Sequence, residues 1–160
     1  MVRKIYKYPE DKEILEQKSV EVEELTDEIK KLIEDLKDTV LYKHGAGISA
    51  IQLGKPYRIC VINWDGIHVL INPIVTRSRG EKIMNEGCLS VPGVFVETKR
   101  AQKVWISAKD ENWNDIEYAE GGNGSYIAQH ELDHFEGTCT LFKEYDRLEE
   151  SKNVEANTEN

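Results

Sequence analysis

Residues 129–134 read Gln-His-Glu-Leu-Asp-His, and they place His130 and His134 four positions apart. Residues four apart on a helix share one face, with Cβ atoms roughly 5–6 Å apart, so both imidazoles can bind a single ion. Glu131 lies one step round the helix, where its carboxylate can reach a water molecule on that ion, as a general base must. The segment therefore predicts a helix that binds a metal ion.

A solvated helix whose histidines are four apart by chance is the alternative, and a bare five-residue pattern does not exclude it. Two metallopeptidase patterns fit the surrounding sequence less well. A metzincin would continue His-x-x-Gly-x-x-His, whereas this chain matches the glycine at Gly137 but has Thr140 at the histidine position. A thermolysin-like site takes a downstream Glu, yet only a short polar tail follows the helix. The third ligand is therefore sought upstream or on sulfur.

Among the remaining histidines and cysteines, Cys88 is the strongest candidate for the third ligand. It lies in a turn-rich stretch, Asn-Glu-Gly-Cys-Leu-Ser-Val-Pro-Gly, which has little reason to bury a cysteine except to present its sulfur. Cys60 is flanked by Ile and Val and is expected in the core, and Cys139 follows the helix closely as a small buried residue. His44 and His68 fit ordinary surface or half-buried histidines. Two imidazoles and one thiolate leave a fourth position open, as a catalytic ion requires.

Hydrophobic periodicity predicts an α+β fold. Residues 23–43 carry apolar side chains at the three-and-four spacing of one helical face, with Thr26 as N-cap and Gly45 as stop. Ser125 can cap the second helix, which runs to about Gly137. Between the two helices, β-branched and aromatic runs predict strands over residues 57–63, 68–75, 94–96 and 103–108, with turns at Asp65-Gly66 and Arg79-Gly80. We expect antiparallel β-sheets around a central metal-binding helix, plus an N-terminal helix.

Length and charge limit the domain count and the partners. The 160 residues suit one domain, so we expect a single catalytic domain over residues 1–142 and a short, polar, disordered tail over residues 143–160. The net charge of -9 argues against nucleic acid or an anionic membrane as partner and favours small molecules or peptides. No apolar run approaches about 18 residues and no signal-peptide core opens the chain, so we expect a cytoplasmic protein.

Three segments together resemble the peptide deformylase family. Gly45-Ala46-Gly47-Ile48-Ser49-Ala50-Ile51-Gln52 is similar to the family's first motif, Glu86-Gly87-Cys88-Leu89-Ser90 to its second, and Gln129-His130-Glu131-Leu132-Asp133-His134 to its third. They follow the family's order and approximate spacing, and the resemblance extends from the first predicted helix to about Phe142. One such segment could be coincidence, whereas three in order are very specific.

The resemblance implies a function and a set of roles. The family removes the formyl group from the N-terminal formyl-methionine of nascent polypeptides or peptides and releases formate. By resemblance, Cys88, His130 and His134 bind the metal and Glu131 handles protons. The Gln52 side chain and the Leu89 backbone N–H then form the oxyanion hole, which suits a formamide carbonyl that becomes a tetrahedral oxyanion under attack.

Further residues around the site are assigned less specifically. Apolar side chains at Met84, Tyr126 and Ile127 are candidates for the methionine pocket, with ordinary core packing as an equal alternative. By resemblance, Asp133 and Arg100 are candidates for a pair that orients the metal helix, although a surface ion pair fits nearly as well. The glycines and the alanine of the first two motifs, Ala46, Gly47 and Gly87, are placed beside the substrate backbone.

Some positions depart from the family pattern. Ala46 stands where Ile or Val is usual and Ser49 where Ala is common, so we expect a wider or more polar pocket. Many members end in a longer amphipathic helix that can bind the ribosome, whereas this tail is short and acidic, and ribosome association by that route is not expected. The family's usual metal is Fe²⁺, but the Irving–Williams order favours zinc or nickel at N/S sites, so purified protein can carry either.

Two other functions compete with this hypothesis. A metallopeptidase would share the His-Glu-x-x-His chemistry but would cut internal amide bonds, and it lacks an identifiable third ligand here. A non-catalytic protein could use the ion only to join the helix to the sheet, but it would need neither Glu131 nor Gln52 and would close the fourth position.

Overall fold

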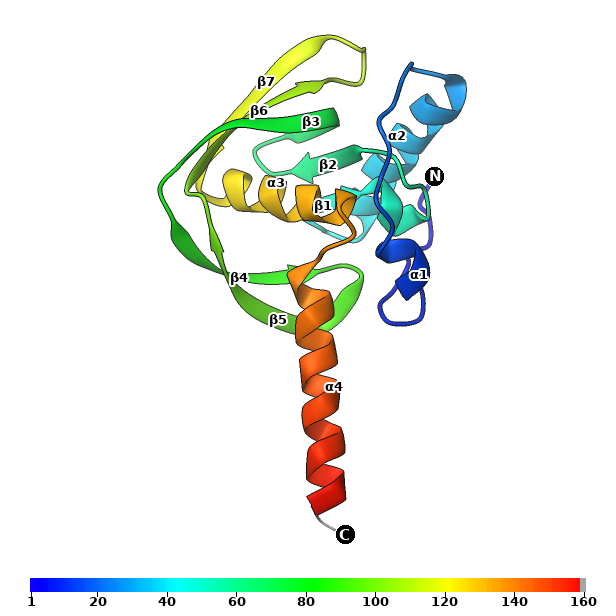
Figure 1. Ribbon diagram of the computed structural model, residues 1–160. Coiled ribbons are helices and arrows are strands. Elements are labelled where there is room, and N and C mark those ends of the chain that lie inside the picture. Colours follow the sequence, from blue (N-terminus) through cyan, green and yellow to red (C-terminus); the bar gives the residue numbers. More distant parts are fainter. Residues whose placement is uncertain (159–160) are drawn as a thin grey trace.

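The computed structural model describes residues 1–158, which form two sheets and a set of helices (Figure 1). In chain order the elements are α1 (Lys12–Leu15), α2 (Asp27–Tyr42), β1 (Gly47–Ser49), the 3-10 helix η1 (Ala50–Leu53), β2 (Ile59–Asn63), β3 (Ile67–Arg79), β4 (Lys82–Cys88), β5 (Val91–Arg100), β6 (Lys103–Lys109), β7 (Asp115–Gly121), α3 (Gly122–Phe135) and α4 (Thr140–Thr158).

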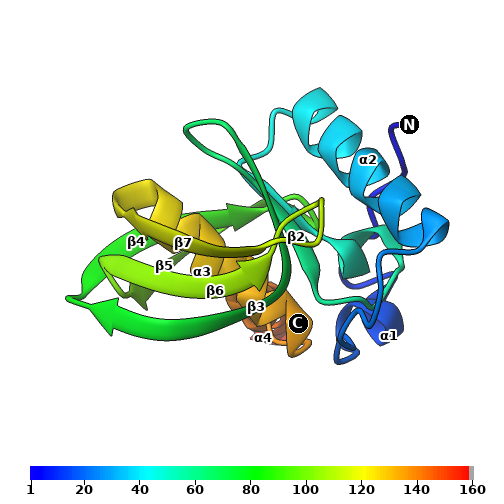
Figure 2. The same cartoon turned by 90° about the horizontal axis from the view of Figure 1, so that it is seen from above.

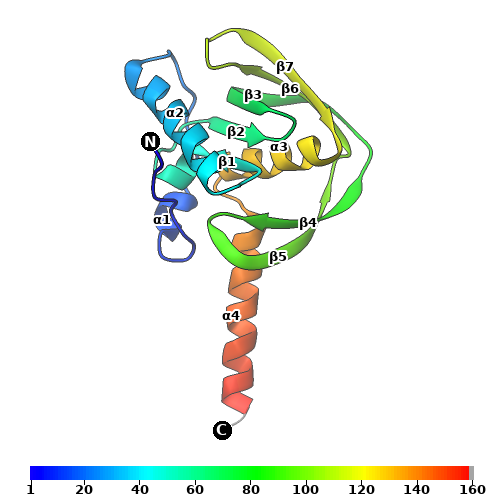
Figure 3. The same cartoon turned by 180° about the vertical axis from the view of Figure 1, so that it is seen from behind.

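The strands form one five-stranded sheet and one hairpin, with α3 between them. The larger sheet has the order β1-β2-β3-β6-β7 and its neighbours are antiparallel, while β4 pairs only with β5. Opposite views show α3 enclosed between this sheet and the β4–β5 hairpin (Figures 1 and 3). The expected α+β fold, with antiparallel sheets around a central helix, is confirmed.

Strand β2 is covered on both faces, which explains its continuous apolar sequence. Alternate residues of a strand point to opposite faces. In β2, Ile59 and Val61 join the core that includes α2, whereas Cys60 and Ile62 join the core that includes α3. Cys60 is fully buried there, as predicted. From above, α2 and the β4–β5 hairpin lie at opposite ends of the molecule (Figure 2).

The sequence predicts the N-cap of α2 correctly, but not the N-cap of α3. Thr26 caps α2, because its side chain accepts a hydrogen bond from the Ile29 N–H. The second helix, α3, begins at Gly122, three residues before Ser125. Ser125 does not cap it; its hydroxyl donates to the Ala101 carbonyl at 2.8 Å and fixes α3 to the turn between β5 and β6.

Three strands were not predicted. β1 is only three residues long, and β4 and β7 have the sequences KIMNEGC and DIEYAEG, whose polar residues hide the alternation. Both β4 and β7 have exposed faces, so charged side chains are tolerated there. The segment that ends in Cys88 therefore has the composition of a turn, although it is a strand.

The C-terminal segment differs from the expected disordered tail. The structure describes the helix α4 through Thr158, while residues 159–160 lie outside the described part. Its first turn is anchored because Leu141 and Phe142 are buried and the Phe142 ring stacks on Tyr8 at 4.5 Å. Further along, α4 is mostly exposed and extends away from the rest of the fold (Figure 1).

No helix among residues 1–158 combines the length and apolar character needed to cross a membrane.

Candidate metal centre and active site

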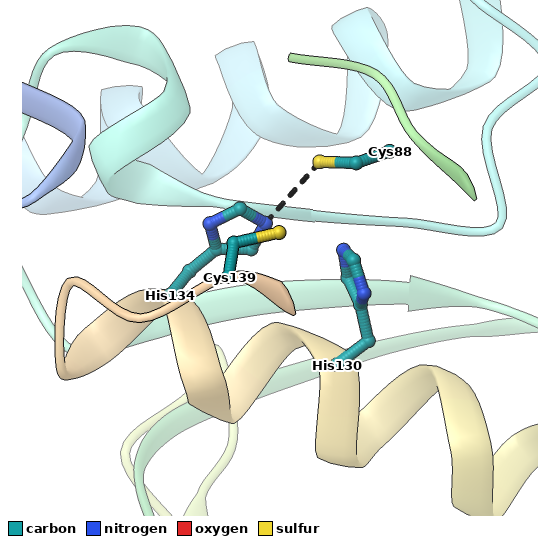
Figure 4. A group of neighbouring side chains, drawn as sticks. All are labelled: Cys88, His130, His134 and Cys139. Carbon is teal, nitrogen blue, oxygen red and sulfur yellow. Dashed lines mark hydrogen bonds between the residues drawn. The ribbon is translucent and has the colours of Figure 1, made fainter. Parts of the chain in front are cut away.

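The three expected ligands converge on one point at the centre of the fold. His130 and His134 project from α3, and Cys88 reaches them from the end of β4 (Figure 4). The Cys88 sulfur lies 3.4 Å from His134 Nε2, and the two imidazole rings are 5.0 Å apart between centroids. Cys139 joins them, and the potential ligand atoms of all four side chains lie within 4.8 Å of one another.

Burial gives both histidines the protonation state that a metal ligand needs. His130 and His134 are 7% and 0% exposed, and a buried imidazole is disfavoured in its charged form. Burial lowers the pKa of His130 to about 4 and moves the pKa of His134 well below its usual range, with the neighbouring His130 as a second cause. Neutral imidazoles beside thiol sulfur are a donor set that fits a divalent transition metal.

Glu131 is held beside this cluster in a buried position. Its carboxylate accepts a hydrogen bond from the Ser49 hydroxyl at 2.8 Å, and it is only 3% exposed. Burial raises the pKa of Glu131 to about 8, and the bond from Ser49 opposes that rise. A Cβ atom at Gly47 would lie 2.9 Å from Glu131 Oε1, so β1 can pass this close to α3 only with glycine there.

A hydrogen bond at the start of the 3-10 helix η1 orients the Gln52 side chain toward the cluster. Its Oε1 accepts from the Ser49 N–H at 2.9 Å, which leaves the amide nitrogen pointing the other way. That nitrogen donates to Ser90 Oγ at 3.0 Å and lies 3.6 Å from the Cys88 sulfur. Leu89 follows Cys88 directly, in the turn that joins β4 to β5. Both expected oxyanion-hole residues therefore adjoin the cluster.

An ion-pair network links the metal helix to the hairpin. Arg100 donates to Asp133 at 2.7 Å, as the sequence suggested, and also to both carboxylate oxygens of Glu86 at 3.1 and 3.0 Å. Glu86 Oε1 in turn lies 3.8 Å from His130 Nδ1. The Arg100 side chain is 11% exposed, so this is not a surface ion pair. Sequence reasoning missed Glu86, although it belongs to the second motif.

A cavity of about 370 Å³ opens onto this cluster. Its wall includes Gln52, Cys88, Leu89, His130 and Glu131. All six expected substrate-binding residues also line it, namely Ala46, Gly47, Met84, Gly87, Tyr126 and Ile127. The structure adds Val94 and the exposed Phe95, which sequence reasoning missed because β5 looked like an ordinary strand.

The other candidate ligands lie outside the cluster, with one exception. His44 is exposed and His68 is half-buried against Tyr118, so neither joins the site. Cys139 was expected to be a small buried residue; it is buried, but its sulfur also faces the metal ligands. Its position soon after the metal helix was the only signal in the sequence.

Comparison with known proteins agrees with this geometry. A sequence model of a family described as Polypeptide deformylase matches residues 2–153. The chain belongs to the peptide deformylase family. It is therefore a metal-dependent hydrolase of the amidohydrolase type, with deformylase activity.

Named peptide deformylases match along nearly the whole chain. The protein of Dictyoglomus thermophilum is 37% identical over 142 residues, which cover 88% of this chain and 92% of that relative. The protein of Aquifex aeolicus is 38% identical over 144 residues, covering 86% and 84%. The crystal structure from Legionella pneumophila has a TM-score of 0.84 at 32% identity and covers 98% of each chain. A peptide deformylase from Ehrlichia chaffeensis, solved in complex with actinonin, has a TM-score of 0.85 at 30% identity and covers 98% of this chain and 97% of that one.

Proposed function

We propose that this enzyme hydrolyses the formyl group from the N-terminal formyl-methionine of nascent polypeptides and releases formate. The observation that carries the proposal is that Cys88, His130 and His134 meet in one cluster, and that Cys88 and His130 line a cavity together with Glu131 and Gln52. Two imidazoles and a thiolate would hold the metal, and a carboxylate and an amide donor lie beside these three side chains. Membership of the deformylase family supports this assignment.

Glu131 is the proposed general base and acid. When bound, the divalent metal would supply Lewis acidity, which lowers the pKa of a water molecule so that it can lose a proton and attack a formamide at neutral pH. Glu131 takes the proton from the attacking water and then delivers it to the departing methionyl amine. Its burial favours a protonated carboxyl, which suits the second of these steps, and the hydrogen bond from Ser49 favours the carboxylate needed for the first.

Gln52 and Leu89 are the proposed oxyanion donors. As the formyl carbonyl becomes tetrahedral, negative charge develops on its oxygen, and preorganised N–H donors lower the barrier by roughly 3–4 kcal/mol each. The Gln52 amide nitrogen already lies on the Cys88 side of its helix, held there by the bond between Ser49 N–H and Gln52 Oε1. A backbone N–H at Leu89 would supply the second donor from the β4–β5 turn.

The cavity is the proposed site for the methionine side chain. Met84, Tyr126 and Ile127 provide apolar surface for a thioether side chain, while Ala46, Gly47 and Gly87 let the substrate backbone approach closely. Since actinonin is bound in the Ehrlichia chaffeensis structure, we expect the same compound to occupy this cavity and to compete with substrate.

We propose Fe²⁺ as the working metal, with zinc or nickel bound in some preparations. The cysteine ligand beside iron is sensitive to oxidation, whereas nickel is not redox-active under the same conditions. Protein purified in air should therefore be less active than an anaerobic iron preparation or a nickel-substituted one. Formate release measured on all three, with metal content determined in parallel, checks this. Equal activity per metal ion in all three would remove the case for iron.

Formate release from a formyl-methionyl peptide tests the activity directly. We expect the metal-loaded protein to release formate and Glu131→Ala to lose it by a factor of about 10² or more while still binding metal. Exposed Glu117→Ala is the matched control and should keep the wild-type rate. Cleavage of the peptide between residues would favour a metallopeptidase instead, and metal binding without any hydrolysis would favour a structural ion.

We further propose that residues 1–142 form the single catalytic domain and that the enzyme acts in the cytoplasm on nascent chains. No nucleic-acid or membrane partner is proposed, because the net charge is -9. Within α4, five acidic side chains stand against three basic ones, which does not favour docking to ribosomal RNA.

A further inference from the structure

Cys139 places a second sulfur in the cluster that holds the expected metal ligands. The ligand atoms of Cys88, His130, His134 and Cys139 lie within 4.8 Å of one another, and Figure 4 shows the Cys139 sulfur directed toward the other three. In a tetrahedral site with metal–ligand bonds of about 2.0–2.3 Å, ligand atoms lie roughly 3.3–3.8 Å apart. The 3.4 Å between Cys88 Sγ and His134 Nε2 already meets that spacing. Shifts on the order of an ångström would bring the remaining ligand atoms to the same spacing.

The backbone around Cys139 is fixed on both sides. Before it, α3 ends in a tight turn at Gly137, whose φ is +71° and where a Cβ atom would lie 2.1 Å from the Glu16 carbonyl oxygen. After it, Leu141 and Phe142 are buried against the N-terminal segment. Cys139 is therefore presented by an ordered corner between α3 and α4, not by a free loop.

Ordinary apolar packing accounts for only part of the surroundings of the Cys139 side chain. A buried cysteine usually serves as a small apolar side chain, and Cys60 in the same protein does so, among Ile and Leu residues. Cys139 is also buried, at 2% exposure, and belongs to an apolar cluster with Leu141 and Phe142, but its sulfur lies near the Cys88 thiol and two imidazoles as well. It also directly precedes the 19-residue helix α4, whose N-terminal backbone N–H groups stabilise negative charge nearby.

We propose that Cys139 is a fourth protein ligand, so that the metal site of this chain is a Cys₂His₂ set in its resting state. The inference rests on the proposed function, because it adds a ligand to the metal site on which that function depends. Four protein donors, two of them thiolates, would hold a divalent transition metal more tightly than three. The Cys139 thiolate then competes with water for the fourth position, which a catalytic site with three protein ligands would leave open.

Cobalt substitution of the full chain tests the number of thiolate ligands. Absorption from thiolate-to-cobalt charge transfer grows with the number of bound sulfurs. Cys139→Ala should therefore lose roughly half of the wild-type intensity, as should Cys88→Ala, because each removes one of two sulfur ligands. Cys60→Ala removes a buried cysteine outside the cluster and should keep the full intensity. Thermal unfolding of each variant establishes that it is folded, and Cys139→Ser provides a second variant of nearly native volume.

Metal retention gives an independent readout. In competition with a chelator, zinc should bind Cys139→Ala and Cys139→Ser at least about tenfold more weakly than wild type. Even the loss of a residue that only hydrogen-bonds a metal ligand typically lowers metal affinity by about that factor, so the loss of a ligand should do no less. Cobalt absorption of folded Cys139→Ala at the wild-type level would overturn the inference, as would unchanged zinc affinity in both variants.

Formate release separates this inference from the proposed function. If the Cys139 variants release formate and their cobalt spectra match that of wild type, the function stands and Cys139 is not a ligand. If the spectrum loses half its intensity but no metal-loaded form releases formate, the four-ligand site stands and the function fails.

Discussion

Three features of its surroundings determine how Glu131 can act. Gly47 allows β1 to approach it, Ser49 donates a hydrogen bond to its carboxylate, and burial disfavours its charge. A general base works best when its pKa lies near the operating pH, because it must both take and release a proton. Ser49 is also a departure from the family pattern that the sequence connected only with pocket polarity.

Ser49→Ala tests this positioning role at the scale of one hydroxyl. Losing a hydrogen bond to a charged carboxylate should lower kcat/KM roughly tenfold. Because the Ser49 bond lowers the pKa of Glu131, its removal should raise that pKa and move the acidic limb of the pH–rate profile to higher pH. Exposed Ser107→Ala is the control. A reduced rate with an unmoved profile would mean that Ser49 acts only on packing.

At the scale of elements, α3 is fixed between the sheet and the hairpin by polar contacts that the hydrophobic pattern does not reveal. Arg100 at the end of β5 binds Asp133 on α3 and Glu86 on β4, and Glu86 lies beside His130. The network therefore sets the distance between the helix that carries the histidines and the strand that carries Cys88. Such outer partners orient metal ligands and tune their affinity.

Arg100→Leu should break this coupling. It leaves the 7%-exposed Glu86 without its cation, which should cost about 3 kcal/mol of unfolding free energy. Zinc affinity should fall about 10- to 100-fold. Lys99→Leu is the matched control on the same strand, because its ion pair with Glu81 is exposed on both sides and spans 3.8 Å. Denaturant unfolding and chelator competition check both effects, and equal losses in the two variants would contradict the role of Arg100.

The composition of the C-terminal segment predicts disorder, whereas the structure forms the helix α4 there. Its sequence is polar, and a polar segment that buries no face is expected to be disordered. Anchoring of Leu141 and Phe142 starts the helix, and pairs three residues apart, such as Arg147 with Glu144, support its exposed part. Nucleation by tertiary packing thus overcomes a composition that is unfavourable by itself.

At the scale of the whole molecule, the active site is costly to fold without its metal. Glu131 and both histidines are buried near the centre, where ionisable groups are unfavourable unless paired. The Glu131 pKa is about 8 in the fold and near 4.5 in an unfolded chain, so between these values the folded state binds one more proton. Glu131 by itself should therefore make a contribution to the stability of the metal-free protein that is lost progressively as pH rises from about 4.5 to 8.

Glu131→Gln isolates this contribution. The variant has no titrating group at this position, so its stability advantage over metal-free wild type should grow by up to about 4 kcal/mol between pH 5 and pH 8. Buried His130, whose pKa is lowered to about 4, removes stability as pH falls below 6.5, but it does so in both proteins. Urea unfolding at several pH values checks this, with Glu117→Gln as the exposed control. A stability difference independent of pH would contradict the assigned cause.

The sequence by itself determined the elements whose information is local. The 3.6-residue period specified α2, Thr26 specified its cap, and a four-residue spacing put His130 and His134 on one face of α3. The α+β fold and the three expected ligands followed from these patterns together with the resemblance carried by three motifs.

Only the tertiary structure decided the contacts between residues distant in the chain. Ser49 meets Glu131 across 82 positions, and Arg100 joins Asp133 across 33. Cys139 is close to His134 in sequence, yet the direction of its sulfur depends on the turn at Gly137 and on the burial of α4 against the N-terminal segment. Periodicity records which face of an element is buried, but not which partner covers it, because that choice is made by the packing of the whole chain.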